Sequence, residues 1–153
     1  MSDPNLQMQR QIQALQDDLE RLRKADAGAV AVTYTPTYSG ASTTGVTTYT
    51  GQAGKYVRFG PFVTFTLYIG WSAATGTGQA VIGLPLNVAN VTLQFHSASI
   101  WYQGVTYAGT GVITLIRPNT ARAELWTPAS NAASSSVDVE AAGEIVMTGS
   151  YFV

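Results

Sequence analysis

The large apolar residues near the N-terminus recur with the spacing of a helix that packs against other helices. They are four, three, four and three positions apart: Met8, Ile12, Leu15, Leu19 and Leu22. This is a heptad pattern with apolar residues at positions a and d, and most residues between them favour a helix. The pattern predicts a short coiled coil formed with copies of the same chain. A single helix folded back on its own domain is the alternative.

Further along the chain, the pattern changes to the two-residue alternation of β-strands. The strongest signal covers residues 55–69, which Gly60-Pro61 divides into two strands. After this break, one face of the strand is fully apolar: Val63, Phe65, Leu67, Ile69 and Trp71. The opposite face is mixed: Phe62, Thr64, Thr66 and Tyr68. The first face is therefore predicted to point into a core.

Other short alternating segments predict a β-rich body. The predicted strands are 29–36, 46–50, 79–86, 92–95, 99–103, 105–108, 109–118, 121–127, 137–140 and 144–153. In the last of them Ile145, Met147, Tyr151 and Val153 should face inward. The remainder of 37–54 and residues 128–136 are predicted to be loops. We therefore expect a mainly β protein with an antiparallel, jelly-roll-like β-sandwich at 28–153, preceded by a helical anchor at 1–27.

Charged residues are unevenly distributed between the N-terminal segment and the β-rich body. Charged residues make up 11% of the chain, and nine of the 17 lie within residues 1–26. A body so poor in charge indicates a surface that is covered by copies of itself or by another protein. The net charge of −1 and the lack of a basic patch argue against nucleic acid. There is no cysteine, no apolar run as long as a membrane span and no N-terminal signal region, so synthesis in a cytoplasm is expected.

Few residues offer chemistry. His96 is the single histidine and is expected to be structural or exposed, since a metal site needs several ligands. Asp138, Glu140 and Glu144 could be offered as hydrolase carboxylates, but a solvated strand face explains them as well. We expect no enzyme activity, no metal and no cofactor. Four aromatic residues could contact a glycan or instead belong to the core or a subunit interface: Trp71, Trp101, Tyr102 and Trp126.

One segment also resembles a known group of proteins. Its pattern comprises Gly54, Tyr56, Gly60, the strand 63–71, Thr77-Gly78 and Gly83-Leu84-Pro85. This pattern resembles that of small bacteriophage virion proteins: head fibres, capsid-decoration proteins and tail fibres with a β-sandwich body. The resemblance implies a homotrimer in which the N-terminal helices bundle and the sandwiches pack about the same axis.

Together these features predict a non-enzymatic structural protein of a virion. We expect a short homotrimeric head fibre or capsid decoration protein, anchored by its N-terminal helix to a capsid or cement protein. A head attachment needs only a short peg such as residues 1–27. The alternative is a receptor-binding tail fibre or tail-spike tip that binds a tail adaptor and adheres to host surface glycans. A free carbohydrate-binding module or glycan hydrolase is a third possibility.

Overall fold

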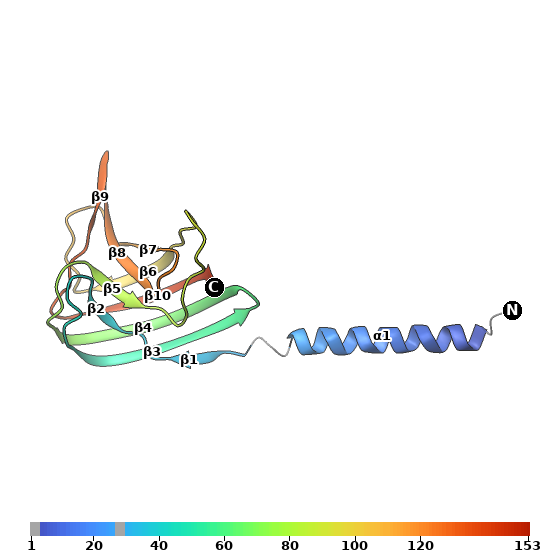
Figure 1. Ribbon diagram of the computed structural model, residues 1–153. Coiled ribbons are helices and arrows are strands. Elements are labelled where there is room, and N and C mark those ends of the chain that lie inside the picture. Colours follow the sequence, from blue (N-terminus) through green and yellow to red (C-terminus); the bar gives the residue numbers. More distant parts are fainter. Residues whose placement is uncertain (1–3, 27–29) are drawn as a thin grey trace. The chain divides into compact units, whose positions relative to one another are not determined.

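The chain forms two units in the computed structural model, which describes residues 4–26 and 30–153 (Figure 1). The first unit contains one helix, α1 (Pro4–Asp26), and the second comprises Ala31–Val153. The helix covers the residues for which the heptad pattern predicted it. The predicted boundary at 27/28 falls among residues 27–29, which lie outside the described residues.

The second unit is a sandwich of two antiparallel sheets, as the alternating pattern predicted. The sheet that we call sheet A has the strand order β1-β3-β4-β10-β6, and sheet B has the order β2-β5-β8-β7, with β9 added beside β8. Successive strands mostly alternate between the sheets, as they do in a jelly roll. The strand bounds are β1 Val32–Tyr34, β2 Tyr38–Gly40, β3 Thr47–Phe59, β4 Phe62–Ala74, β5 Ala80–Gly83, β6 Ala98–Gln103, β7 Ile113–Ile116, β8 Arg122–Ala129, β9 Ala132–Ser136 and β10 Gly143–Phe152.

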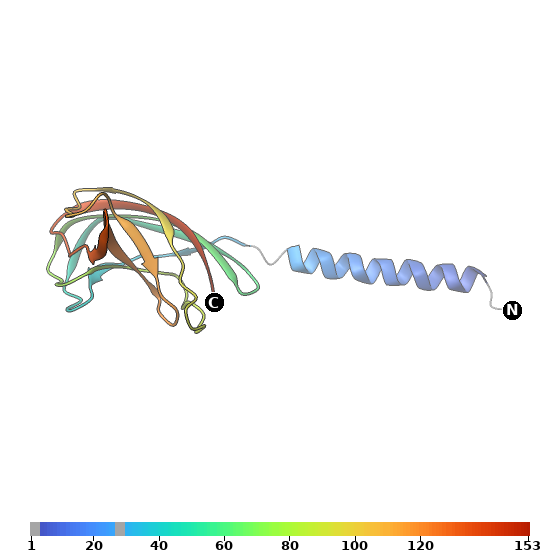
Figure 2. The ribbon, with the colours of Figure 1, turned by 90° about the horizontal axis from the view of Figure 1, so that it is seen from above.

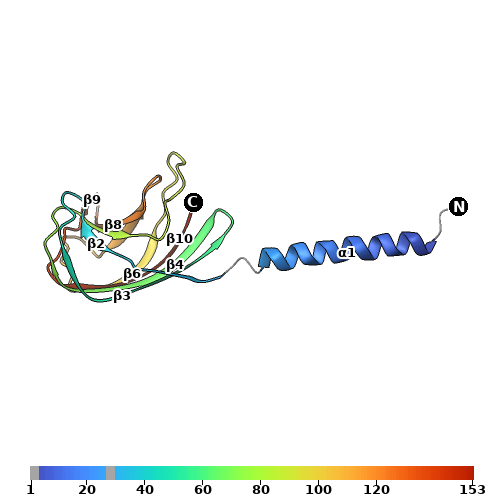
Figure 3. The same ribbon diagram turned by 60° about the horizontal axis from the view of Figure 1, so that its bottom comes forward.

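The long hairpin of β3 and β4 forms the centre of sheet A. Gly60 occupies its turn with a φ of 58°, which a glycine adopts without strain. The apolar face predicted for residues 63–71 is buried, and so are Ile145, Met147 and Tyr151 of β10. Strand β10 lies between β4 and β6, and Figure 2 shows the long strands arching together. In Figure 3 the shorter strands of sheet B lie across this curved layer.

Two aromatic rings connect the sheets. Tyr38 of β2 stacks on Trp71 of β4 with ring centroids 4.0 Å apart. The Trp71 Nε1–H donates to the carbonyl oxygen of Glu140 over 2.9 Å, and the Glu140 amide donates to the Tyr38 hydroxyl over 2.9 Å. These bonds satisfy the polar atoms of both rings, which is what allows such large side chains to be buried between the sheets.

The prediction that most of 37–54 is loop was wrong. This segment forms β2 and the first half of β3, which begins at Thr47 and has an irregular register with β4 around Tyr49. Two of its glycines lie in β3 where neighbouring rings cover them: Tyr68 lies over Gly51, and Tyr34 lies over Gly54. A glycine in a strand often marks such a close approach, but the sequence does not show which ring will supply it.

Four further predictions also fail. No strand forms at 92–95, 105–108 or 137–140. Leu93 has a φ of 63° in a turn, and Asp138 makes only an isolated bridge with Gln79. Residues 128–136 instead form the end of β8 and all of β9, through a turn at Asn131 with a φ of 63°. Every β9 side chain is exposed, so no apolar alternation marks this strand. The hairpin projects from the sandwich in Figure 1.

We expect the sandwich to lose stability in alkali above pH 10. Burial raises the pKa of Tyr38 and of Tyr151 from 10 to about 12. Both hydroxyls are then neutral in the folded state at a pH where the unfolded chain already releases their protons. Their contribution is complete below pH 10 and declines as the pH rises towards 12. Thermal unfolding from pH 8 to 12 measures this, and a melting temperature that stays constant across pH 10–12 would contradict it.

Candidate functional site

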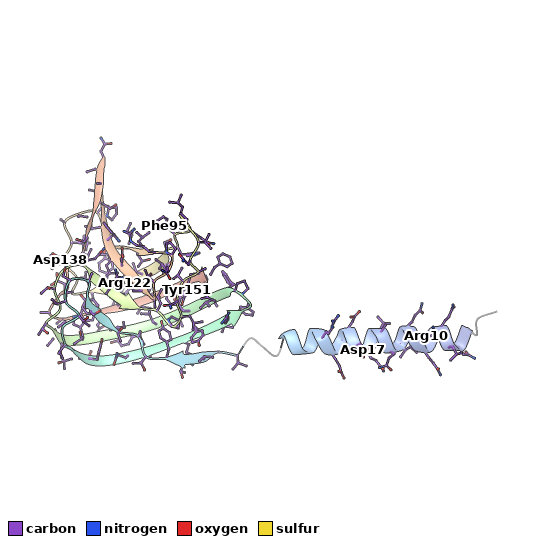
Figure 4. The ribbon with its side chains drawn as sticks, in the orientation of Figure 1. Arg10, Asp17, Phe95, Arg122, Asp138 and Tyr151 are labelled. Carbon is purple, nitrogen blue, oxygen red and sulfur yellow. The ribbon has the colours of Figure 1, made fainter. Side chains whose placement is uncertain are left out.

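The apolar stripe of α1 lies at the surface of the single chain. Met8, Ile12, Leu15 and Leu19 are all exposed, with Leu15 at 68%. The side chain of Leu22 lies outside the described residues. In Figure 4 side chains project from all sides of the helix, Arg10 and Asp17 among them. Exposed leucine and isoleucine in a heptad register are typical of a helix that packs against partner helices.

The four aromatic residues predicted as glycan contacts do not form one platform. Trp71 is the clearest correction: it is 2% exposed and its ring is stacked on Tyr38. Tyr102 is half-buried against the core and meets Tyr107 edge to face, with centroids 5.6 Å apart. Trp71 is therefore a core residue, which was the alternative to glycan contact, and a glycan could not stack on its ring.

The other two tryptophans lie on opposite outer faces of the sandwich. Trp101 of β6 is 52% exposed and lies on the outer face of sheet A, next to Val146 of β10. Trp126 of β8 is half-buried and lies on the outer face of sheet B, opposite Ile113 of β7. A single ligand could therefore contact one of these tryptophans but not both.

Trp126 belongs to a cluster of charged and aromatic side chains on sheet B. At its centre is Glu124, which is only 4% exposed although it lies on an outer face. Its Oε2 accepts hydrogen bonds from Arg117 Nε over 2.8 Å and from Trp126 Nε1 over 3.2 Å. Arg122 Nη2 lies 3.7 Å from Oε1. We call this group, together with Phe95, the Glu124 cluster.

Aromatic rings hold one guanidinium of the Glu124 cluster. The Arg117 Cζ lies 5.9 Å from the centroid of the Phe95 ring and 5.8 Å from that of Trp126, a distance at which cation–π attraction acts. Arg117 uses Nε on Glu124, so its two terminal nitrogens remain as donors beside a tryptophan. Figure 4 labels Phe95 and Arg122 in this part of the sandwich. Such a group can bind a polar ligand that also offers a flat apolar surface.

Sequence reasoning overlooked this cluster. Alternation along 121–127 correctly placed Glu124 and Trp126 on one face, because they are two residues apart on a strand. The partners of Glu124 come from elsewhere in the fold: Arg117 follows β7 in the chain, and Phe95 of a distant loop flanks the Arg117 guanidinium. One signal was present: three of the eight charges after residue 26 lie within residues 117–124.

The remaining candidate residues have structural roles or lie apart. Glu140 Oε1 accepts from the Thr106 amide over 3.1 Å, while Asp138 is exposed. The backbone of His96 pairs with Ile116, and burial lowers the pKa of its imidazole. Among the described residues, no group of three His, Asp or Glu side chains could hold a metal. No described helix is long and apolar enough to cross a membrane.

Comparison with known proteins adds a structural relationship. The sequence matches no protein-family profile and no curated protein. A search of solved structures finds the crystal structure of the Dettilon tailspike protein, with a TM-score of 0.63 and 17% sequence identity. The fold of this chain is similar to that of part of this tailspike. The match covers 81% of this chain, and the chain spans 24% of the length of the tailspike chain.

Proposed function

We propose that this protein is a structural component of a bacteriophage virion: a homotrimeric spike whose helices join the copies and whose sandwiches are displayed. The fold that it shares with part of a tailspike carries this proposal. The exposed heptad stripe of α1 supports it, because a lone chain would leave that stripe in water. The low charge of the sandwich supports it as well, because subunit contacts would cover part of such a surface.

We propose a location on the tail, and the likeness of the fold to part of a tailspike protein supports this. The alternative is a head fibre or capsid decoration protein, which the sequence pattern favoured. Immunogold labelling of intact particles distinguishes the two locations, and gold at the tail is the expected result. Gold on the head would instead favour a head fibre or capsid decoration protein. Its absence from purified virions would overturn the proposed function.

We also propose that the protein is not an enzyme. Two acids of the sandwich are already engaged by other groups: Arg117 and Trp126 hold Glu124, and the Thr106 amide binds Glu140. Incubation with polysaccharide from the surface of the host bacterium should release no reducing ends. Steady release of reducing ends would contradict this part of the proposal.

If the spike adheres to a glycan, we expect the Glu124 cluster to make the contact. Its tryptophan ring lies beside free guanidinium donors, whereas no cation–π contact among the described residues involves Trp101. Trp126→Ala should weaken retention on immobilised host polysaccharide roughly fivefold, because an aromatic contact contributes about 1 kcal/mol. Trp101→Ala is the matched control and should retain binding. Equal retention of the Trp126→Ala variant and the unmodified chain would show that the Glu124 cluster does not contact the glycan.

A further inference from the structure

The two outer faces of the sandwich differ in charge. Sheet B carries the Glu124 cluster, with two arginines and a glutamate. On sheet A, strand alternation directs Lys55 of β3 and Glu144 of β10 outward. These two are the charged residues on the outer face formed by β3, β4, β10 and β6. Since charge keeps a free surface soluble, the outer face of sheet A is the better suited of the two to be covered.

Apolar side chains form two rows across the outer face of sheet A. The strand register places Ala53, Tyr68, Val146 and Trp101 side by side, one from each of four adjacent strands. At the end of the sheet nearest the β3–β4 turn, the register aligns Phe59, Phe62 and Phe152, and the last two rings meet edge to face at 5.5 Å. All three phenylalanines are exposed. Exposed apolar rows of this kind mark an interaction surface.

Between these rows, beside Lys55, four hydroxyl side chains are already hydrogen-bonded in two pairs. Thr148 Oγ1 donates to Thr66 Oγ1 over 3.3 Å, and Ser150 Oγ donates to Thr64 Oγ1 over 3.3 Å. Burying a hydroxyl costs much less when it keeps a hydrogen-bond partner. This part of the face can therefore lose its water without leaving those groups unsatisfied.

Two shallow hollows shape the same face. One, of about 220 Å³, is lined by Ala53, Lys55, Thr66, Tyr68 and Val146 among others. The next, of about 190 Å³, is lined by Val57, Thr64 and Thr148 on the other side of Lys55. Each hollow has room for one or two apolar side chains of a neighbouring molecule.

We propose that the outer face of sheet A packs against a second copy of this chain within the spike. This inference rests on the proposed self-association. Sheet A begins with β1, its edge strand, and only residues 27–31 separate β1 from α1. Five residues span at most about 18 Å, so helices that associate side by side hold the β1 edges of neighbouring copies close together. Trp101 then becomes a subunit-contact residue, and the Glu124 cluster stays accessible on the opposite sheet.

Single cysteines can test this in the full-length protein, because the native chain has none. Val146→Cys places a thiol on the proposed interface, and Ile113→Cys places one on the outer face of sheet B. The two parent residues are exposed to a similar degree in the single chain, at 38% and 45%. In the assembled protein, we expect a maleimide to label Cys at position 146 at least about tenfold more slowly than at position 113, as burial protects a site from reagents. Thr66→Cys provides a second probe of the same face.

A helix variant separates this inference from the proposal on which it rests. Adding Leu15→Asp and Leu19→Asp to each cysteine variant should release the copies and make positions 146 and 113 label equally fast. Fast labelling at both 146 and 66 in a protein whose mass shows several copies would overturn the interface but leave the proposed oligomer intact. A single-copy mass for the unmodified chain would overturn both.

Discussion

Substituting Leu15→Asp together with Leu19→Asp is expected to convert the protein into single chains of 16.2 kDa. Both leucines belong to the exposed heptad stripe of α1. A parallel bundle would bury each aspartate against its copies in neighbouring helices, and buried like charges without a partner are strongly destabilising. Light scattering after size-exclusion chromatography gives the mass, and circular dichroism shows whether the β signal is retained.

The control for this experiment puts two aspartates on the same helix away from the stripe. Gln13→Asp with Ala14→Asp adds the same charge at heptad positions b and c, which face solvent in a coiled coil. This variant should keep the mass of the unmodified protein. If the stripe variant also keeps that mass, α1 does not join the copies. A loss of β signal in the stripe variant would show instead that the sandwich requires assembly to fold.

The second large effect is expected for Trp71→Ala, which should destabilise the sandwich by about 3–5 kcal/mol. The substitution removes the ring that stacks on Tyr38 between the two sheets and leaves the Glu140 carbonyl without its indole donor. For a domain of this size, the melting temperature should fall by about 10–20 °C. Thermal unfolding at one fixed protein concentration measures the change, so that assembly does not shift the comparison.

Two variants help interpret that result. Trp71→Phe keeps a ring against Tyr38 but cannot donate to Glu140, so an intermediate loss is expected. Trp101→Ala removes a tryptophan of the same size from an exposed position and should unfold close to the unmodified protein, apart from any stability that subunit contact provides. Equal melting temperatures for Trp71→Ala and Trp101→Ala would contradict the core role of Trp71.

The sequence predicted the parts of this molecule that depend on local periodicity. Alternation over residues 63–71 identified the buried face of β4, and the 4-3-4-3 spacing from Met8 to Leu22 predicted a helix there. Strand β9 escaped prediction because its side chains are all exposed and show no apolar pattern. The first half of β3 was missed because its glycines signal loops unless one knows that Tyr34 and Tyr68 cover them.

The candidate site was less predictable, because it depends on which strands become neighbours. Four aromatic residues were singled out, yet their positions were set by strand order: Trp71 inside, Trp101 on sheet A and Trp126 on sheet B. Two other members of the Glu124 cluster come from different segments: Arg117 follows β7, and Phe95 lies in the loop before β6. Periodicity assigns residues to a face but does not identify the neighbours that they meet there.

The central claim is that copies of this chain associate, and sedimentation equilibrium of the unmodified protein tests it most directly. At micromolar concentration we expect a species of three times the 16.2 kDa chain mass, dissociating only on strong dilution. A homogeneous 16.2 kDa species at every concentration would contradict the claim, because the exposed stripe of α1 and the outer face of sheet A would then have no partner in solution.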